Sequence, residues 1–328
     1  MWLYRVLVAE DRLSNFYTLG LALALHRLSN HISNLGQHSE ALPPIEESVN
    51  LYRELVTRDP GFRLNLADSL SILSIRLGSL GRRSEALNPI EECVEINRKL
   101  VEKDPASHKP NFALSLQNLS VTLSDLERHS EALPAIQESV SLWRELVAMH
   151  PVSYKADLAN SLHSLSFKLS KLGRYSDALP PIQEALSLRR ELVAMHPVSY
   201  KADLANSVFN LSYILSVLER DSEALAIIQE SVSIYRELVA LYPASYSSEF
   251  ALSLSNLTAI LYHLGRYNEA LDAGKESLSL YRPLFADYPL VYTHHLWRTL
   301  GVVARILDRL GKHDEASAAR VEADSLST

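Results

Sequence analysis

The chain has 328 residues, of which 47% are hydrophobic and 22% are charged, and its formal net charge is -7. A single cysteine, Cys93, excludes a disulfide-rich scaffold, and no uninterrupted apolar stretch of roughly 18 residues is present to form a membrane span. Proteins that bind nucleic acids usually carry a basic surface, so the acidic balance disfavours that class.

The sequence repeats itself with a step of 45 residues once and 46 residues thereafter. A segment of the form Ser-Glu-Ala-Leu returns in related forms that begin at Ser39, Ser84, Ser130, Ser176, Ser222, Asn268 and Asp314. A proline follows the same step at Pro60, Pro105, Pro151, Pro197, Pro243 and Pro289. This regularity indicates one array of repeats, not an assembly of unrelated domains.

The first half of each repeat predicts a helix, called helix A below. In the fourth repeat, Leu158, Leu162, Leu165 and Leu169 recur at spacings of three and four, which places them on one helical face. Gly173 then stands where a helix end favours a residue tolerant of positive φ. The equivalent positions hold Gly36, Gly81, Gly265 and Gly311, but also Glu127 and Glu219. At the two glutamates we expect either a different turn or about 1 kcal/mol of strain.

The second half of each repeat predicts another helix, called helix B. Ser176 and its equivalents are residue types that accept backbone N–H bonds, so we expect them to cap its start. Several repeats carry internal prolines, which we expect to lie within about the first turn of helix B, where proline costs little. These are Pro43, Pro44, Pro89, Pro134, Pro180 and Pro181. The recurring proline at the end of each repeat is expected to close helix B.

This pattern resembles the tetratricopeptide repeat, TPR, over nearly the whole chain. The small residue in the middle of helix A is Ser29, Ser74, Ser120, Ser166, Ser212, Thr258 or Ala304. The glycine and aromatic residue of the turn appear as Gly173 with Tyr175 and as Gly265 with Tyr267. The helix B alanines are Ala41, Ala86, Ala132, Ala178, Ala224, Ala270 and Ala316. The unit is longer than the usual TPR of about 34 residues, so the array is most similar to the long repeats of kinesin light chain.

The resemblance implies an all-α fold, a right-handed superhelical α-solenoid of stacked antiparallel helix pairs with repeats of 45 to 46 residues. We expect seven pairs over residues 16–328, with the last pair acting as a C-terminal cap. Residues 4–8 match residues 52–56, so residues 1–15 are expected to be a partial helix B of a preceding repeat or a capping helix. A partial helix would indicate that the natural protein continues upstream.

No motif for catalysis, nucleotide binding or zinc binding is found in the sequence. Cys93 stands where other repeats carry serine or alanine, which favours a packing role, and the twelve histidines are scattered. Carboxylates such as Glu46 and Glu47 recur on helix B and are best explained by a solvated face. We therefore expect no enzyme activity, no cofactor and no metal.

The side of helix A opposite the leucine stripe mixes aromatic residues, asparagines and serines instead of the lysine and glutamate of a merely solvated surface. In TPR arrays that side lines the concave groove, and this composition suits an extended peptide or protein segment. The candidate groove residues are Gln117, Asn118, Val121, His163, Phe167, Asn206, Phe209, Asn210, Tyr213, Asn256 and Tyr262. Similarity to kinesin light chain implies peptide contacts for Asn118, Asn210 and Asn256. The alternative is that Phe167, Phe209 and Tyr213 pack between neighbouring repeats.

Two further series recur along the helices B, and we interpret both as structural. Tyr52, Trp143, Tyr235 and Tyr281 share one position in helix B and are expected in the core or seam. The arginines that follow this position are expected to span the seam between helices, and they are Arg53, Arg98, Arg144, Arg190, Arg236 and Arg282. The two segments 141–161 and 187–207 differ only in that Trp143 is replaced by Arg189, which indicates an internal duplication.

The sequence therefore favours a non-enzymatic, cytoplasmic interaction scaffold that binds a protein or peptide partner, with no role in binding nucleic acid or membrane. The alternative is the repeat region of a larger signalling or sensor protein whose nucleotide-switch module is not in this chain. An upstream reading frame with a nucleotide-binding motif would favour the alternative.

Overall fold

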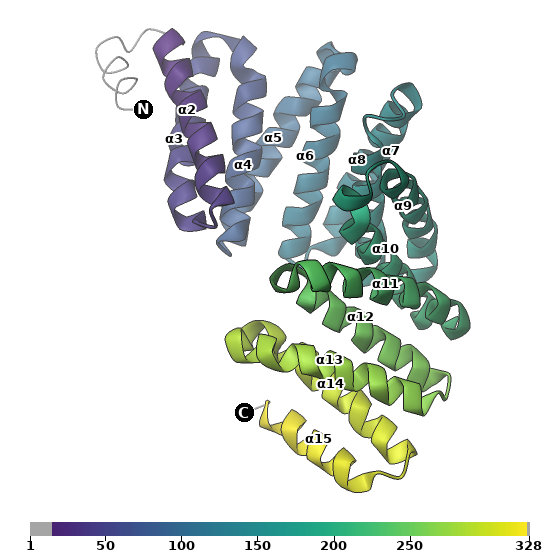
Figure 1. Cartoon of the computed structure of the whole chain (residues 1–328). Coiled ribbons are helices and arrows are strands. Elements are labelled where there is room, and N and C mark those ends of the chain that lie inside the picture. Colours follow the sequence, from purple (N-terminus) through teal and green to yellow (C-terminus); the bar gives the residue numbers. More distant parts are fainter. Residues whose placement is uncertain (1–14, 327–328) are drawn as a thin grey trace. The chain divides into compact units, whose positions relative to one another are not determined.

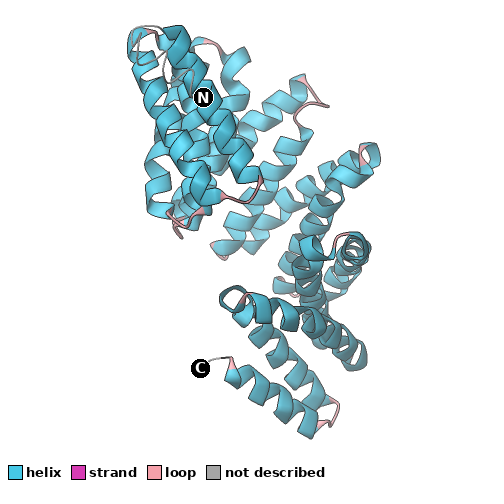
Figure 2. Ribbon diagram, turned by 60° about the vertical axis from the view of Figure 1, so that its left-hand side comes forward, coloured by secondary structure: helices cyan, strands magenta, loops and turns pink. Residues whose placement is uncertain are grey.

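The computed structural model describes residues 15–326, and these form fourteen α-helices and one short 3-10 helix without any β-strand (Figures 1 and 2). The chain divides into two compact units at Leu172 and Gly173. The first unit contains α2 (Asn15–Asn34), α3 (His38–Arg58), the 3-10 helix η1 (Pro60–Phe62), α4 (Arg63–Ser79), α5 (Arg83–Lys103), α6 (Pro105–Asp125), α7 (His129–Met149) and α8 (Lys155–Lys171). The second contains α9 (Tyr175–Met195), α10 (Pro197–Val217), α11 (Asp221–Leu241), α12 (Pro243–His263), α13 (Tyr267–Asp287), α14 (Pro289–Arg309) and α15 (His313–Ser325).

Consecutive helices pack on one another within each unit. The pairs α2 with α3, α4 with α5 and α6 with α7 form in the first unit, and α10 with α11, α12 with α13 and α14 with α15 form in the second. Each pair also contacts the next, through α3 with α4, α5 with α6, α11 with α12 and α13 with α14. This confirms the predicted all-α repeat architecture, in which the even-numbered helices are helices A and the odd-numbered helices are helices B. The helix expected over residues 1–15 lies outside the described residues, apart from Asn15, which opens α2.

The small residues and alanines of the repeat signature lie in the core. Every helix B alanine of the series is at most 1% exposed, and the serines at the middle of helix A are at most 3% exposed. Ser48 in α3 donates a hydrogen bond of 2.9 Å to the carbonyl oxygen of Ala22 in α2. Cys93 holds the equivalent position in α5 and is 1% exposed, so its predicted packing role is confirmed. Burial also raises the pKa of its thiol to about 12, so the thiol stays protonated near neutral pH.

The turn from helix A to helix B uses one residue at positive φ. Gly81 has a φ of 73°, and the N–H of the next residue, Arg82, donates to the carbonyl oxygen of Leu77 at 2.9 Å. Glu127 and Glu219 adopt the same conformation, with φ of 59° and 60°. The sequence left open whether these glutamates adopt a different turn or a strained version of the same turn. Both keep the turn that glycine forms elsewhere, so the strained alternative is found.

Helix B begins earlier than expected, so the prediction that Ser176 and its equivalents cap it is wrong. In α9 the residue before the helix is Arg174, which forms no side-chain cap bond, and Ser176 is already the second helical residue. The short connection of three residues, 172–174, explains the shift, because only Arg174 separates the positive-φ Gly173 from the first helical residue. Arg174 instead donates to Asp177 in the first turn at 2.7 Å. The equivalent pairs are Arg82 with Glu85, Arg128 with Glu131, Arg220 with Glu223 and Arg266 with Glu269.

The prolines fall partly where the sequence places them. Every helix B that is followed by the recurring proline ends two residues before it, as expected, and Pro105, Pro197, Pro243 and Pro289 then open the next helix A. The internal prolines lie deeper than expected, because the early helix start leaves residues such as Pro134 beyond the first turn. Helix α7 nevertheless continues through Pro134 to Met149.

The two recurring helix B series are structural, as predicted. The aromatic positions are buried, with Tyr52 and Tyr281 at 1% exposure. The arginines form salt bridges from one helix B to the next: Arg53 with Glu92, Arg98 with Glu138, Arg190 with Glu230, Arg236 with Glu276 and Arg282 with Glu322. The carboxylates expected on a solvated face thus include several that pair with arginines while they remain accessible to solvent.

Candidate functional site

The candidate groove residues lie on helices A, and they divide between the two units. Those from Gln117 to Phe167 belong to α6 and α8 of the first unit, and those from Asn206 to Tyr262 belong to α10 and α12 of the second. We use the term helix A surface for the exposed and half-buried side chains of α4, α6 and α8 in the first unit and of α10 and α12 in the second. Each part is described by itself.

In the first unit, Val121 and Phe167 occupy equivalent positions and expose 42% and 44% of their surface. These apolar side chains are therefore accessible to a partner. The Nζ of Lys171 lies 5.4 Å from the centre of the Phe167 ring, one helical turn further along α8. Gln117 and His163 are half-buried, and Gln117 accepts a hydrogen bond from Ser161 of α8.

The asparagines of the series form bonds between repeats. Asn118 in α6 donates from Nδ2 to the Oγ of Ser71 in α4 at 3.0 Å, and Asn256 in α12 donates to Ser212 in α10 at 2.9 Å. Asn256 is only 8% exposed, whereas Asn118 and Asn210 are half-buried. These contacts place Asn118 and Asn256 in the packing between neighbouring helices A. Asn118 keeps its Oδ1 free of any donor among residues 15–326.

In the second unit, Asn206 is exposed, whereas Phe209 and Tyr213 are half-buried. The rings of Tyr213 and Tyr175 are 6.3 Å apart, and a hydrogen bond with Tyr213 raises the pKa of Tyr175. Tyr213 therefore packs against the start of α9 while part of its surface stays accessible, and its contact with a peptide stays a prediction.

Tyr262, also in the second unit, is already engaged on its ring face. The guanidinium of Arg305 lies 5.5 Å from the ring centre, and the ring of Tyr267 lies 5.8 Å away. A hydrogen bond with Tyr262 also raises the pKa of Arg309. This side chain is thus held between α13 and α14, which leaves less of it available than the sequence suggested.

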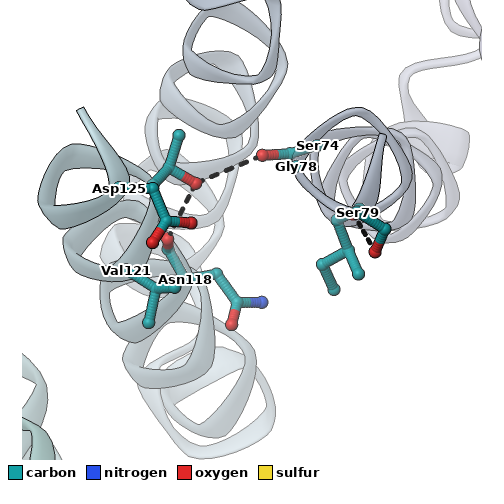
Figure 3. A pocket seen from close by; sticks show the side chains of 8 residues that line it. Ser74, Gly78, Ser79, Asn118, Val121 and Asp125 are labelled. Atoms are coloured by element: carbon teal, nitrogen blue, oxygen red, sulfur yellow. Dashed lines mark hydrogen bonds between the residues drawn. The ribbon is translucent and has the colours of Figure 1, made fainter. Parts of the chain in front are cut away.

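A pocket of about 330 Å³ opens on the helix A surface of the first unit, between α4 and α6 (Figure 3). Asn118, Val121 and Asp125 line it from α6 and face Ser74, Gly78 and Ser79 of α4. Ile75 and Thr122 complete the lining. Two of these residues, Asn118 and Val121, are among the candidates taken from the sequence.

Sequence reasoning missed the α4 side of this pocket. Ile75 stands at the position equivalent to Val121, and this equivalence in the sequence is the signal that could have identified it. Its side chain is also 42% exposed. Gly78 stands where the next two repeats have Ser124 and Ser170, and a Cβ built on it would meet no atom within 4 Å. The missing side chain is thus what leaves the pocket open.

Among the described residues, no group of three or more His, Cys, Asp or Glu side chains is arranged to hold a metal ion. Within the same residues, no helix is long and apolar enough to cross a membrane.

Comparison with known proteins supports the repeat assignment. A family model of the tetratricopeptide repeat matches residues 66–107, 112–151, 158–197 and 250–285. A second model, anaphase-promoting complex subunit 5, matches residues 7–60 and 194–239. A search of curated proteins gave no match. The matching models indicate no catalytic family.

Several solved structures have a similar fold at low sequence identity. A signal transduction ATPase with numerous domains from Pyrococcus horikoshii, which has a tetratricopeptide repeat sensor, is 14% identical with a TM-score of 0.66. The match covers 98% of this chain and 45% of that protein. BtubC from P. vanneervenii is 16% identical with a TM-score of 0.58, over 75% of this chain and 91% of BtubC. A Podosopora anserina protein with nearly identical TPR-like repeats, described as a putative kinesin light chain, is 16% identical with a TM-score of 0.51, over 66% of this chain and 95% of that chain.

Proposed function

The chain is a repeat protein of the tetratricopeptide superfamily, and from this premise we propose that it is a non-enzymatic interaction scaffold whose helix A surface binds a peptide or an extended protein segment. The observation that carries the proposal is that the exposed Val121 lines the pocket between α4 and α6 together with Asn118, and that Phe167 is exposed at the equivalent position on α8. Apolar side chains next to a few polar groups are typical of binding sites, because the first desolvate and the second orient.

Two side chains from different units test the proposal. We expect the double substitution Phe167→Ala and Tyr213→Ala to leave the helical content unchanged and to weaken the capture of partners from an extract of the native source. The helical content is measured by circular dichroism and the capture by quantitative mass spectrometry. The two single variants then show which unit contributes.

A matched control removes apolar surface elsewhere. Met149 and Leu241 end helices B and are 56% and 70% exposed, so the double substitution Met149→Ala and Leu241→Ala removes comparable apolar surface away from helices A. We expect it to leave capture unchanged. Equal loss of capture in both double variants, or unchanged capture in the helix A variant, would contradict a site on this surface.

A second candidate function is that of a sensor region in a larger signalling protein. The similarity to the Pyrococcus horikoshii protein favours it, since almost all of this chain matches a part of that protein described as having a tetratricopeptide repeat sensor. Sequencing the natural locus upstream tests it: a continuous reading frame with a phosphate-binding loop of the form GxxxxGK[ST] is the expected result. A stop codon directly upstream would remove this candidate.

We also propose that the protein acts in the cytoplasm and does not bind nucleic acid. One buried free cysteine suits a reducing compartment, and a net charge of -7 opposes binding to phosphates. Cell fractionation and an electrophoretic mobility assay with random-sequence DNA and RNA test these two points.

A further inference from the structure

The pocket between α4 and α6 has the dimensions and walls of a site for one long side chain. Its volume of about 330 Å³ exceeds that of any single amino-acid side chain, and Ile75 and Val121 present apolar surface into it from opposite helices. Gly78 leaves open space where the neighbouring repeats carry serines. In the fourth repeat, Phe167 stands where the third repeat has Val121, so a bulkier ring occupies the equivalent position on α8.

The polar groups of the pocket are mostly used within the protein. Ser74 contacts Thr122 at 3.4 Å, Thr122 donates to the carbonyl oxygen of Asn118 at 3.1 Å, and Ser79 donates to the carbonyl oxygen of Ile75 at 3.0 Å. Asp125 differs from them, because no hydrogen bond or salt bridge joins its carboxylate to any residue that the structure describes. The pocket thus combines apolar walls with a carboxylate that forms no hydrogen bond or salt bridge within the described residues, although the charge of Lys168 acts on it.

We propose that this pocket takes an arginine or lysine side chain of the bound peptide, whose aliphatic stem lies between Ile75 and Val121 and whose cation pairs with Asp125. Long basic side chains bury their stems on apolar surface and keep their charge at a polar edge, which is the arrangement that these walls offer. The inference rests on the proposed binding of a peptide to the helix A surface. It adds the class of side chain recognised there.

Asn118 fixes where the peptide backbone runs. Its Nδ2 donates to Ser71, so its Oδ1 is left to accept an N–H from the peptide beside the pocket.

Lys168 on α8 is the cation that competes for Asp125, since the two attract each other electrostatically. Lys168 is 3% exposed and stands where Ile214, Ile260 and Ile306 occur in later repeats, so isoleucine is a fitting replacement.

The experiment measures the side-chain preference of the full chain with a synthetic peptide library. Acetylated and amidated nine-residue peptides carry arginine, lysine, leucine or glutamate at the central position and random residues elsewhere, and binding is read by fluorescence anisotropy. We expect the arginine and lysine pools to bind at least fivefold more tightly than the glutamate pool. Asp125→Asn should remove this preference and also its decrease with salt, because the ion pair is screened in salt solution.

Three variants complete the design. Gly78→Leu places a side chain in the pocket and should abolish binding of the basic pools, while Lys168→Ile removes the competing cation and should tighten it. Glu102→Gln removes an exposed carboxylate on α5 and should change nothing. Circular dichroism confirms that each variant is folded.

The outcomes separate this inference from the proposal on which it rests. Binding of the pools without a basic preference, or a preference that Asp125→Asn leaves unchanged, overturns the pocket assignment while the peptide-binding surface stands. Tighter binding of the glutamate or leucine pool overturns it in the same way and identifies another class of side chain. Failure of every pool to bind the wild-type chain overturns both.

Discussion

The Oγ of Ser29 in α2 donates a hydrogen bond of 2.7 Å to the carbonyl oxygen of Ala41 in α3. The same bond joins Ser74 to Ala86 and Ser120 to Ala132, at 2.8 Å and 2.9 Å. The small residue of helix A and the alanine of helix B in the repeat signature are therefore two sides of one contact. In the second unit, Ser212 and Thr258 instead donate to carbonyl oxygens of their own helices, and Ser212 also accepts a hydrogen bond from Asn256.

This contact predicts that size matters more than the hydroxyl at Ser120. Ser120→Ala should cost about 1 kcal/mol of unfolding free energy, because one buried hydrogen bond is lost while Ala304 shows that alanine fits the position. Ser120→Leu should cost about 3 kcal/mol through overpacking. Urea unfolding followed by circular dichroism measures both, with the exposed Ser141→Ala as a control without effect. Equal costs for alanine and leucine would contradict the argument.

Replacing Glu127 or Glu219 with glycine is predicted to stabilise the chain. Both hold a conformation that costs a non-glycine residue roughly 1–2 kcal/mol, and part of this is returned because glycine is more flexible in the unfolded chain. Glu219→Gly should therefore raise the unfolding free energy by about 0.5–1 kcal/mol. Glu127→Gly should gain slightly less, since Glu127 also contacts His129 at 3.1 Å.

The reverse change at an equivalent turn serves as the control for this prediction. Gly265 has a φ of 71°, so Gly265→Ala should lower the melting temperature, whereas Glu219→Gly raises it. Shifts in the same direction for the two substitutions would show that the turn strain is not what governs stability there.

Much of the fold follows from the repeat, whereas the site follows from departures from it. The positive-φ positions were predictable because five of them are glycine and the turn is the same throughout. The start of helix B was mispredicted because Ser176 has cap chemistry but lies two residues after Arg174, which holds the cap position. The pocket was not predictable, since it depends on a side chain that Gly78 lacks and on the distance between two helices that sequence spacing does not supply.

The duplicated segments allow Arg189 to be compared with Trp143, which holds the same position in the preceding repeat. The Arg189 side chain is 5% exposed at the position that Trp143 fills in the preceding repeat, and it donates to the backbone oxygen of Asp203 at 2.6 Å. Burial lowers the pKa of Arg189, while the negative charge of Asp203 opposes that shift. Replacing a buried charged residue with an apolar one of suitable size is often neutral or stabilising.

Arg189→Trp should therefore keep the fold and leave the melting temperature equal or higher. Arg189→Ala should lower the unfolding free energy by about 3 kcal/mol, because it leaves a cavity beside Asp203. Thermal and urea unfolding of the two variants and the wild-type chain measure these changes, and a clear loss of stability in Arg189→Trp would contradict the argument.

Lys168 predicts an unusual rise of stability at alkaline pH. Burial lowers the pKa of its ammonium from 10.5 to about 8, although the charge of Asp125 opposes that shift. Below pH 8 the folded chain holds a buried positive charge that the unfolded chain solvates freely, so folding is penalised there. The penalty disappears as pH rises from 8 to 10.5, because the folded form releases its proton before the unfolded form does. Relative to Lys168→Ile, the wild-type chain should gain about 2–3 kcal/mol of unfolding free energy over this range.

Urea unfolding of wild-type and Lys168→Ile proteins at pH 7 and pH 10.5 measures this gain. An equal difference between the two proteins at both pH values would show that Lys168 is not held in an unfavourable charged state. Asp125→Asn should enlarge the pH 7 penalty, because it removes the negative charge that partly stabilises the ammonium.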